Sequence, residues 1–394
     1  MLQPDNDAVA GTQLRIRPPT GATLPAVSVQ LGGQTLAVIS SSPQELRVQL
    51  PDATVSGALT MRNLDNQLSG TLASEYRVRK PGVLDALQAG HGSTATWRNS
   101  YLMGLLSYYI YSDALGSGQH AANFRNLMLE WGANGTQFVT EPKMHLRAAV
   151  VWGQDWVAVV FRGTEQHNSA FCIMEMVHPG ICAHVPTNWS KTNLAYRPLH
   201  QRPEWGDNVR THPGFDEATD LLYEEILEVL NTRLTEGHRL YVTGHSLGAA
   251  MATLFSFRAE VLSGIDVHGL YTFGSPRVGN IPFALAYPEP LHNKTQRWQN
   301  RADPAPGLPP GQPIQGRHAP PGPNILTYRH VGRLNYIPPQ GAVEFNRQNE
   351  PFQAPSPARQ LDSDHFMALG GAAYLSRMHQ VMPAAIRSTL PVPP

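Results

Sequence analysis

A serine lies between two glycines near the middle of this 394-residue chain, in the pentapeptide Gly244-His245-Ser246-Leu247-Gly248. The run "LYVTG" before His245 is typical of a buried strand, and the run "LGAAMATLFSF" after Ser246 is typical of a helix. This order predicts a tight strand-to-helix turn that holds the serine hydroxyl at the helix N-terminus, where negative charge is stabilised. The two glycines leave room for the neighbouring strand and helix. The alternative is a serine that only caps an ordinary helix.

Partner side chains separate these alternatives, because a serine hydroxyl is a poor nucleophile without a base and an acid that orients the base. The acid is expected at the carboxyl end of a later strand, where Asp303 lies in "RWQNRADP"; Asp266 precedes a strand and fits a turn better. The base is expected in a C-terminal loop that opens a helix, where His365 lies in "LDSDHFMALG". Three other histidines fit less well: His330 in a strand, which is the second candidate, His318 in a Pro/Gly-rich loop, and His379 in the middle of a helix.

A carbonyl attacked by the serine would become an oxyanion, which needs hydrogen-bond donors already in place. The backbone N–H of Leu247, directly after the serine, is the first expected donor. The run "VAVVFRGTE" ends an earlier strand at Gly163 and Thr164. We therefore expect Thr164 to supply a second backbone N–H, with its hydroxyl as a further candidate donor. In isolation, "RGTE" also fits a plain β-turn.

The elements that must position these residues alternate between strand and helix after about residue 95. This alternation predicts an α/β domain with a mostly parallel central sheet over residues 81–394. The expected strands are "LRAAVVWG", "DWVAVVFRG", "RLYVTG", "VHGLYTFGSPR" and "TQRWQNRADP", and the expected helices are "WRNSYLMGLLSYYIYSD", "AANFRNLMLEWGA", "FDEATDLLYEEILEVLNTRLTEG" and "SLGAAMATLFSFRAEVLSG".

The N-terminal region has a different character. Residues 12–80 alternate apolar and polar side chains in short bursts that are separated by Pro, Gly, Ser, Asn and Asp. This pattern predicts a small all-β Ig-like sandwich domain over residues 1–80. The stretch "VSVQLGGQTLAVISSSPQELRVQLPDATVSGALTMRN" is similar to IPT/TIG-type domains. A targeting or substrate-binding module and a simple spacer are equally compatible with it.

The catalytic motifs jointly resemble the class 3 lipase family, the fungal-type triacylglycerol lipases and their bacterial relatives. The resemblance implies an α/β-hydrolase fold and a serine lipase that uses Ser246, Asp303 and His365 as a catalytic triad. It also implies that Thr164 and Leu247 form the oxyanion hole. The matching pieces occur in family order: "VVFRGTE", "HPGF", "VTGHSLGAAMATL", "TFGSPRVGN", "NRADPAPGLPP", "YRHVG" and "SDHFMALG".

The chain departs from the family pattern between Thr164 and Asn188, within an insertion of about residues 165–211, because this segment is longer than usual and rich in Phe, Ile, Met and Val. In these lipases the region carries a lid, so we expect a lid insertion that opens at a lipid–water interface; an ordinary packed subdomain is the alternative. The segment holds the only two cysteines, Cys172 and Cys182. A disulfide ranks first, free thiols second, and a zinc site with His178 and His184 a distant third. We expect no metal and no cofactor in catalysis.

The amino-acid composition limits the classes of partner that we expect. Thirty Lys and Arg balance thirty Asp and Glu, so the zero net charge gives no indication of a nucleic-acid partner. The N-terminal residues contain no apolar run of signal-peptide length, and the longest apolar run, Tyr101 to Tyr111, is too short to span a membrane. We expect a secreted protein whose leader has been removed or whose export is leaderless, with a cytoplasmic protein as the alternative. The expected partner is a lipid or ester substrate. Alternative functions are a phospholipase A1, a general carboxylesterase, a delivered effector, and, from another class, a non-catalytic lipid-binding protein.

Overall fold

The computed structural model describes residues 7–18, 22–52, 55–79, 81–90, 92–113, 119–163, 200–309, 328–347, 364–365, 367 and 373–392. The chain divides into two compact units. The first comprises residues 1–86, 128–135 and 152–155, and the second comprises residues 87–127, 136–151 and 156–394. The domain boundary that we place after residue 80 from the sequence remains a prediction.

The first unit contains a sandwich of two β-sheets. The larger sheet has the order β1-β8-β7-β3-β4, and the smaller has the order β2-β6-β5. Neighbouring strands are antiparallel in every pair except β1 and β8, which run parallel. The strands are β1 (Asp7–Val9), β2 (Gln13–Ile16), β3 (Val27–Leu31), β4 (Gln34–Thr35), β5 (Ala37–Ser41), β6 (Leu46–Gln49), β7 (Val55–Asn63) and β8 (Ser69–Arg79).

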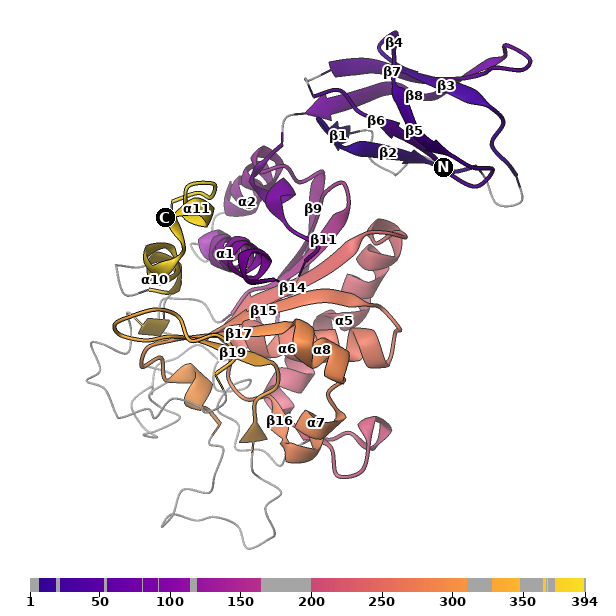
Figure 1. Ribbon diagram of the computed structural model, residues 1–394. Coiled ribbons are helices and arrows are strands. Elements are labelled where there is room, and N and C mark those ends of the chain that lie inside the picture. Colours follow the sequence, from indigo (N-terminus) through magenta and orange to yellow (C-terminus); the bar gives the residue numbers. More distant parts are fainter. Residues whose placement is uncertain are drawn as a thin grey trace, which may run out of the picture. The chain divides into compact units, whose positions relative to one another are not determined.

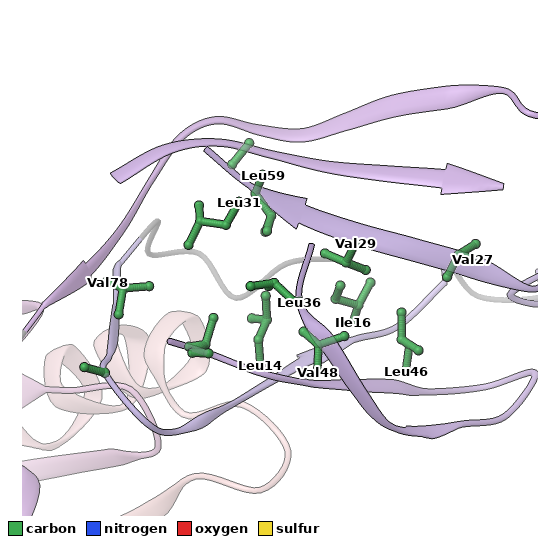
Figure 2. Close-up of a cluster of buried hydrophobic side chains, with 13 residues drawn as sticks. Leu14, Ile16, Val27, Val29, Leu31, Leu36, Leu46, Val48, Leu59 and Val78 are labelled. Carbon is green, nitrogen blue, oxygen red and sulfur yellow. The ribbon is translucent and has the colours of Figure 1, made fainter. Parts of the chain in front are cut away.

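Alternation along the strands builds the core of this sandwich. In β2, β3 and β6 every second side chain is buried, as the period of two in a strand requires. Figure 2 shows these aliphatic side chains converging between the two sheets, with Leu36 from the connection between β4 and β5 among them. The predicted all-β sandwich is therefore confirmed, while its membership of the IPT/TIG type remains a prediction.

The second unit is built on a seven-stranded sheet in the order β19-β17-β15-β14-β11-β10-β9. The five strands from β19 to β11 run parallel. Only three residues join the sheet neighbours β10 and β11, so these two strands form an antiparallel hairpin. The strands are β9 (Gly135–Glu141), β10 (Leu146–Trp152), β11 (Trp156–Phe161), β14 (Arg239–His245), β15 (Val267–Phe273), β17 (Thr295–Asn300) and β19 (Arg333–Ile337).

Helices cover both faces of this sheet. In Figure 1, α1 and α10 lie on one side, and α5, α6 and α8 lie on the other. This arrangement confirms the predicted α/β class with its mostly parallel central sheet. Within the described residues the α-helices are α1 (Ser93–Tyr109), α2 (Gln119–Glu130), α5 (Pro213–Arg233), α6 (Leu247–Val261), α7 (Ile281–Ala286), α8 (Glu289–Lys294), α10 (Tyr374–Val381) and α11 (Ala384–Arg387).

Shorter elements complete the unit. The 3-10 helices include η2 (Ile110–Asp113), η4 (Pro203–Trp205) and η5 (Ala305–Gly307). A small antiparallel sheet in the order β12-β13-β16-β18 consists of β12 (His200–Gln201), β13 (Arg210–Thr211), β16 (Gly279–Asn280) and β18 (Tyr328–Arg329).

Helix α1 is apolar over much of its surface, and three buried polar side chains fix it to the sheet. Asn99 donates its side-chain N–H to the hydroxyl of Tyr271 at 3.2 Å. The indole N–H of Trp298 donates to Ser100 Oγ at 2.9 Å, and Ser107 shares a hydrogen bond of 2.9 Å with Thr243. These bonds satisfy buried polar groups and set the position of α1 along the strands that lead to the site.

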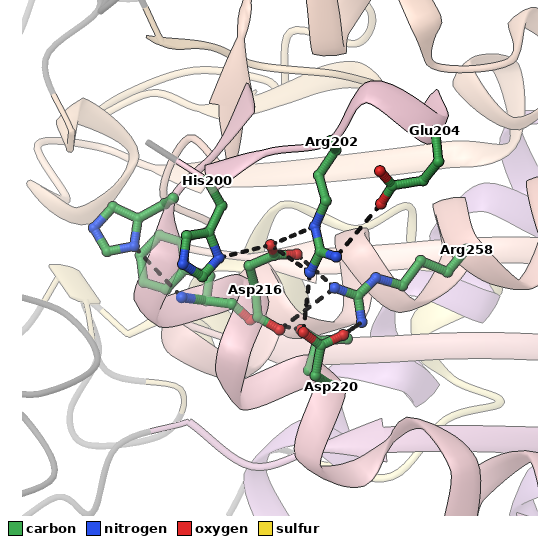
Figure 3. Close-up of polar contacts among 9 residues, drawn as sticks. His200, Arg202, Glu204, Asp216, Asp220 and Arg258 are labelled. Atoms are coloured by element: carbon green, nitrogen blue, oxygen red, sulfur yellow. Dashed lines mark hydrogen bonds and ion pairs between the residues drawn. The ribbon is translucent and has the colours of Figure 1, made fainter. Parts of the chain in front are cut away.

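A buried carboxylate, Asp216 in the first turn of α5, ties α5 to α6 and to the segment around η4 (Figure 3). Asp216 Oδ1 lies 2.5 Å from Arg258 Nη2 on α6, and Asp216 Oδ2 lies 2.6 Å from Arg202 Nη2. Both guanidinium groups also lie over the ring of Trp205, at 5.4 and 5.0 Å from its centroid. The half-exposed Asp220 adds a second carboxylate to both arginines.

Replacing Asp216 with asparagine should therefore lower the free energy of unfolding by about 3 kcal/mol, because it removes the buried anion between two cations. The matched variant Asp220→Asn removes an exposed anion from the same arginines and should cost about 1 kcal/mol or less. Urea denaturation of both variants measures the difference. Equal losses would show that burial of Asp216 does not govern the network.

Candidate active site

Ser246 lies at a sharp turn between strand β14 and helix α6, as the sequence predicts. Its backbone has φ 58° and ψ −125°, a left-handed conformation that is strained for a residue with a side chain. The Ser246 N–H donates to the carbonyl of Phe273 at the end of β15, at 2.9 Å. The turn is thus fixed by its neighbouring strand, and it places the hydroxyl at the N-terminus of α6.

The two glycines of the pentapeptide permit this turn. A Cβ atom on Gly248 would meet the carbonyl of Phe161 and lie 2.9 Å from the nitrogen of Gly163, at the end of β11. A Cβ atom on Gly244 would meet the carbonyl of Gly248 and lie 2.8 Å from the nitrogen of Ala249. Side chains at these positions would push the helix away from the strands, so the close approach requires glycine.

The structure brings together the three side chains that the sequence singles out. His365 Nε2 lies 3.0 Å from Ser246 Oγ, and His365 Nδ1 lies 2.8 Å from Asp303 Oδ1. His365 and Asp303 are buried, with 2% and 0% of their surfaces exposed. Because a carboxylate only accepts, Nδ1 carries the proton and Nε2 offers a lone pair to the serine hydroxyl. This is the protonation pattern that proton transfer from serine requires.

Asp303 follows β17 and is held by donors on both of its oxygens. The N–H of Ala305 donates to Oδ1 at 2.9 Å, and the hydroxyl of Tyr374 on α10 donates to Oδ2 at 2.6 Å. Burial and the adjacent Asp303 charge raise the pKa of Tyr374 well above its usual value, so the phenol keeps its proton. Tyr374 was not identified from the sequence, because an aromatic residue in an amphipathic helix carries no signal of such a contact.

Gly274, directly after β15, provides the surface against which the acid and the base pack. Its φ is +57°, and a Cβ atom there would lie 2.7 Å from Asp303 Oδ2 and 3.1 Å from His365 Nδ1. Only a residue without a side chain allows both groups to approach the backbone here. The motif "TFGSP" could have indicated this contact, because a glycine at the end of a buried strand often marks a place where another group lies close to the backbone.

The backbone next to His365, the expected base, is held by residues that follow the end of β17. Asn300 donates its side-chain N–H to the carbonyl of Asp364 at 2.9 Å, and the Ala302 N–H donates to Asp364 Oδ2 at 3.3 Å. Arg301 Nη1 lies 3.3 Å from Asp364 Oδ1. Burial raises the pKa of Asp364 despite this arginine. The residue before His365 is thereby attached to the same loop that carries Asp303.

One of the two expected oxyanion donors is described. Leu247 is the first residue of α6, and the N–H groups of a helix's first turn have no partner within the helix. Thr164 lies outside the described residues, and its role remains a prediction. Gly163, the residue before it, is described: a Cβ atom there would meet the hydroxyl of Tyr111 and lie 2.5 Å from the carbonyl of His245.

The other acid and base candidates lie elsewhere. Asp266 is exposed and pairs with Lys294 Nζ at 2.5 Å before β15 begins, at the opposite edge of the sheet from Ser246. His330 Nε2 lies 2.8 Å from the carbonyl of Pro306, and burial lowers its pKa well below the usual value. His379 lies on α10 and packs against Tyr101.

Several predictions concern residues that the structure does not describe. These are His318, most of the expected lid segment 165–211, and the group Cys172, His178, Cys182 and His184. Within the described ranges, no cluster of three or more His, Cys, Asp or Glu side chains could hold a metal ion. The same ranges contain no helix that is both long enough and apolar enough to cross a membrane.

Comparison with known proteins finds one family whose sequence model matches part of the chain. Residues 158–312, from strand β11 to beyond Asp303, match the sequence model of the class 3 lipases. Over these residues the chain is similar to the class 3 lipases. Among the relatives, the secreted mono- and diacylglycerol lipase A of Penicillium cyclopium is 34% identical over 113 residues, which cover 28% of this chain and 36% of the relative.

Other relatives extend the comparison. A lipase of Rhizopus niveus is 28% identical over 170 residues, covering 40% of this chain and 36% of its own length. The crystal structure of the lipase from Rhizopus microsporus var. chinensis aligns with a TM-score of 0.48 at 19% identity, covering 74% of this chain and 91% of that one. In sequence, this chain spans only about a third (36%) of the length of these curated relatives.

Proposed function

We propose that this protein is a class 3 lipase, a serine hydrolase that cleaves the carboxylic ester bonds of acylglycerols. The single observation that carries the proposal is the contact chain from Ser246 Oγ to His365 Nε2 at 3.0 Å and from His365 Nδ1 to Asp303 Oδ1 at 2.8 Å. The strained backbone of Ser246 supports the proposal. Backbone strain of this kind is found mainly at functional sites, where the surrounding structure maintains it.

In the proposed cycle, His365 accepts the proton of Ser246 while Oγ attacks the ester carbonyl. The N–H of Leu247, together with that of Thr164, stabilises the oxyanion. The imidazolium then protonates the departing alkoxide, which leaves an acyl-enzyme. A water molecule gives its proton to the same imidazole and attacks the acyl group, and the serine recovers its proton. Asp303 keeps Nδ1 protonated and stabilises the imidazolium.

The names of the relatives support a substrate class and a location for this protein. Relatives are named mono- and diacylglycerol lipases and are named secreted, which supports an acylglycerol substrate at a lipid–water interface and an extracellular protein. The apolar composition of the segment between Thr164 and Asn188 supports a lid over the site. Phospholipase A1 or carboxylesterase activity, delivery as an effector, and lipid binding without catalysis are the competing outcomes.

The decisive experiment treats the protein with a fluorophosphonate and maps the adduct by peptide mass spectrometry. We expect covalent modification of Ser246, because only an activated serine reacts at a useful rate. Rates on emulsified triolein, phosphatidylcholine vesicles and short soluble esters then assign the substrate. A rate increase above the solubility limit of triolein supports a lipase with a lid. A protein that binds lipid but neither reacts with the fluorophosphonate nor hydrolyses any of these esters would refute the proposal.

A further inference from the structure

His245, directly before the nucleophile, is a buried histidine with hydrogen bonds at both ring nitrogens. Its Nε2 lies 2.7 Å from the backbone carbonyl of His365, and its Nδ1 lies 3.0 Å from the hydroxyl of Tyr111. Only 4% of its surface is exposed. The mechanism above gives this residue no part, although its ring centroid lies 4.6 Å from that of His365.

The bonding pattern fixes the tautomer of His245. A carbonyl oxygen only accepts, so Nε2 must carry a proton and donate to His365. Burial, and then the neighbouring His365, lower the pKa of His245 well below its usual value, so the ring is neutral and Nδ1 has a lone pair. Burial raises the pKa of Tyr111, which therefore keeps its proton and donates it to Nδ1. A directed chain runs from Tyr111 through His245 to the backbone of His365.

This chain connects parts of the site that are distant in sequence. His245 ends strand β14 and is covalently joined to Ser246, while its side chain holds the peptide of His365. Asp364, the preceding residue, is held from the β17 loop by Asn300. The backbone of the base is thus fixed from two strands at once, and the second attachment comes from the strand that carries the nucleophile.

The same residues border the strand expected to lead to the oxyanion donor. The hydroxyl of Tyr111 and the carbonyl of His245 both lie where a side chain on Gly163 would be. A shift of His245 would therefore disturb the base and the end of β11 together.

We propose that His245 is a positioning residue for the reaction of Ser246: its imidazole sets the distance between His365 and the serine by holding the His365 carbonyl. It touches no reacting atom and exchanges no proton in the cycle. This inference rests on the proposed hydrolase function. A displacement of about 1 Å at a reacting group can cost on the order of 10²-fold in rate. The loss of the one hydrogen bond at the His365 carbonyl is therefore expected to lower the rate measurably.

The test compares three variants with the unmodified protein. His245→Phe keeps a ring but removes both hydrogen bonds, whereas His245→Gln offers an amide N–H to His365 and an oxygen to Tyr111. His268→Phe is the matched control, because His268 Nε2 also bonds a backbone carbonyl, that of Ala89 at 2.9 Å, but lies near the amino end of β15. The readouts are kcat and KM on a soluble p-nitrophenyl ester, urea denaturation, and the low-field proton signal of His365 Nδ1–H.

We expect His245→Phe to lower kcat about 10- to 100-fold with KM within about twofold of the unmodified value, and to shift or broaden the low-field signal. His245→Gln should recover most of kcat, and His268→Phe should leave kcat and the signal unchanged. If His245→Phe does not fold, Tyr111→Phe replaces it, with an expected loss of about 3- to 10-fold.

Each contrary outcome has a distinct meaning. A His245→Phe protein with unmodified kcat would overturn the positioning role and leave the proposed function standing. If His245→Gln does not recover kcat, and the loss of kcat in the variants follows their loss of unfolding free energy, His245 only stabilises the core. Absence of ester hydrolysis and of fluorophosphonate labelling in the unmodified protein would refute the proposed function, and the positioning role with it.

Discussion

The Ser246→Ala variant should lose ester hydrolysis by on the order of 10³- to 10⁶-fold in kcat/KM while keeping its fold. His365 Nε2 faces Ser246 Oγ at 3.0 Å, so removal of that oxygen leaves the base without a nucleophile to activate. Alanine keeps the Cβ atom and hence the same backbone strain at φ 58°. Turnover of a p-nitrophenyl ester, measured beside urea denaturation, checks both expectations.

Ser246→Gly is the informative companion variant. Glycine adopts a positive φ without steric cost, so this variant should be equally inactive but more stable than Ser246→Ala by about 1 kcal/mol. The pair separates the strain stored at the turn from the chemistry of the hydroxyl. Retained hydrolysis in either variant would show that another group is the nucleophile.

The residues at the ends of strands were predictable from the sequence. Ser246 and Asp303 each follow a strand of recognisable composition, and parallel strands bring their carboxyl ends to one edge of the sheet. His365 could be chosen because it follows "LDSD" in a C-terminal loop. The β-sandwich could also be predicted, because the alternation of apolar and polar residues in β3 and β6 shows directly which side chains enter the core.

The contacts that hold these residues were not predictable. Tyr374 reaches Asp303 across 71 residues, and no local pattern distinguishes its hydroxyl from that of any other helix tyrosine. Asp216 looks like an ordinary charge in the first turn of a helix, but the packing of α5 against α6 buries it completely. Such contacts depend on tertiary packing of side chains, whereas hydrophobic period and motif spacing record only local structure.

The Asp303→Asn variant should lower kcat by about 10²- to 10³-fold, less than the roughly 10⁴-fold loss that follows when an amide forces the wrong histidine tautomer. The difference lies in the donors around the acid. The Ala305 N–H and His365 Nδ1–H both point at Oδ1, so an amide nitrogen at that position would face two donors. The asparagine oxygen should therefore occupy the Oδ1 position and keep accepting from His365.

In this orientation the amide nitrogen donates to the Tyr374 oxygen, which already accepts from the Asn300 N–H at 3.0 Å, and the Tyr374 hydroxyl turns its proton away from the position of Oδ2. The tautomer of His365 survives, and the rate loss reflects only the missing charge beside the imidazolium. The low-field Nδ1–H signal should then persist in Asp303→Asn and vanish in Asp303→Ala. A signal lost in both variants, with kcat reduced about 10⁴-fold or more, would mean that the amide turns its nitrogen to the histidine in spite of the Ala305 N–H.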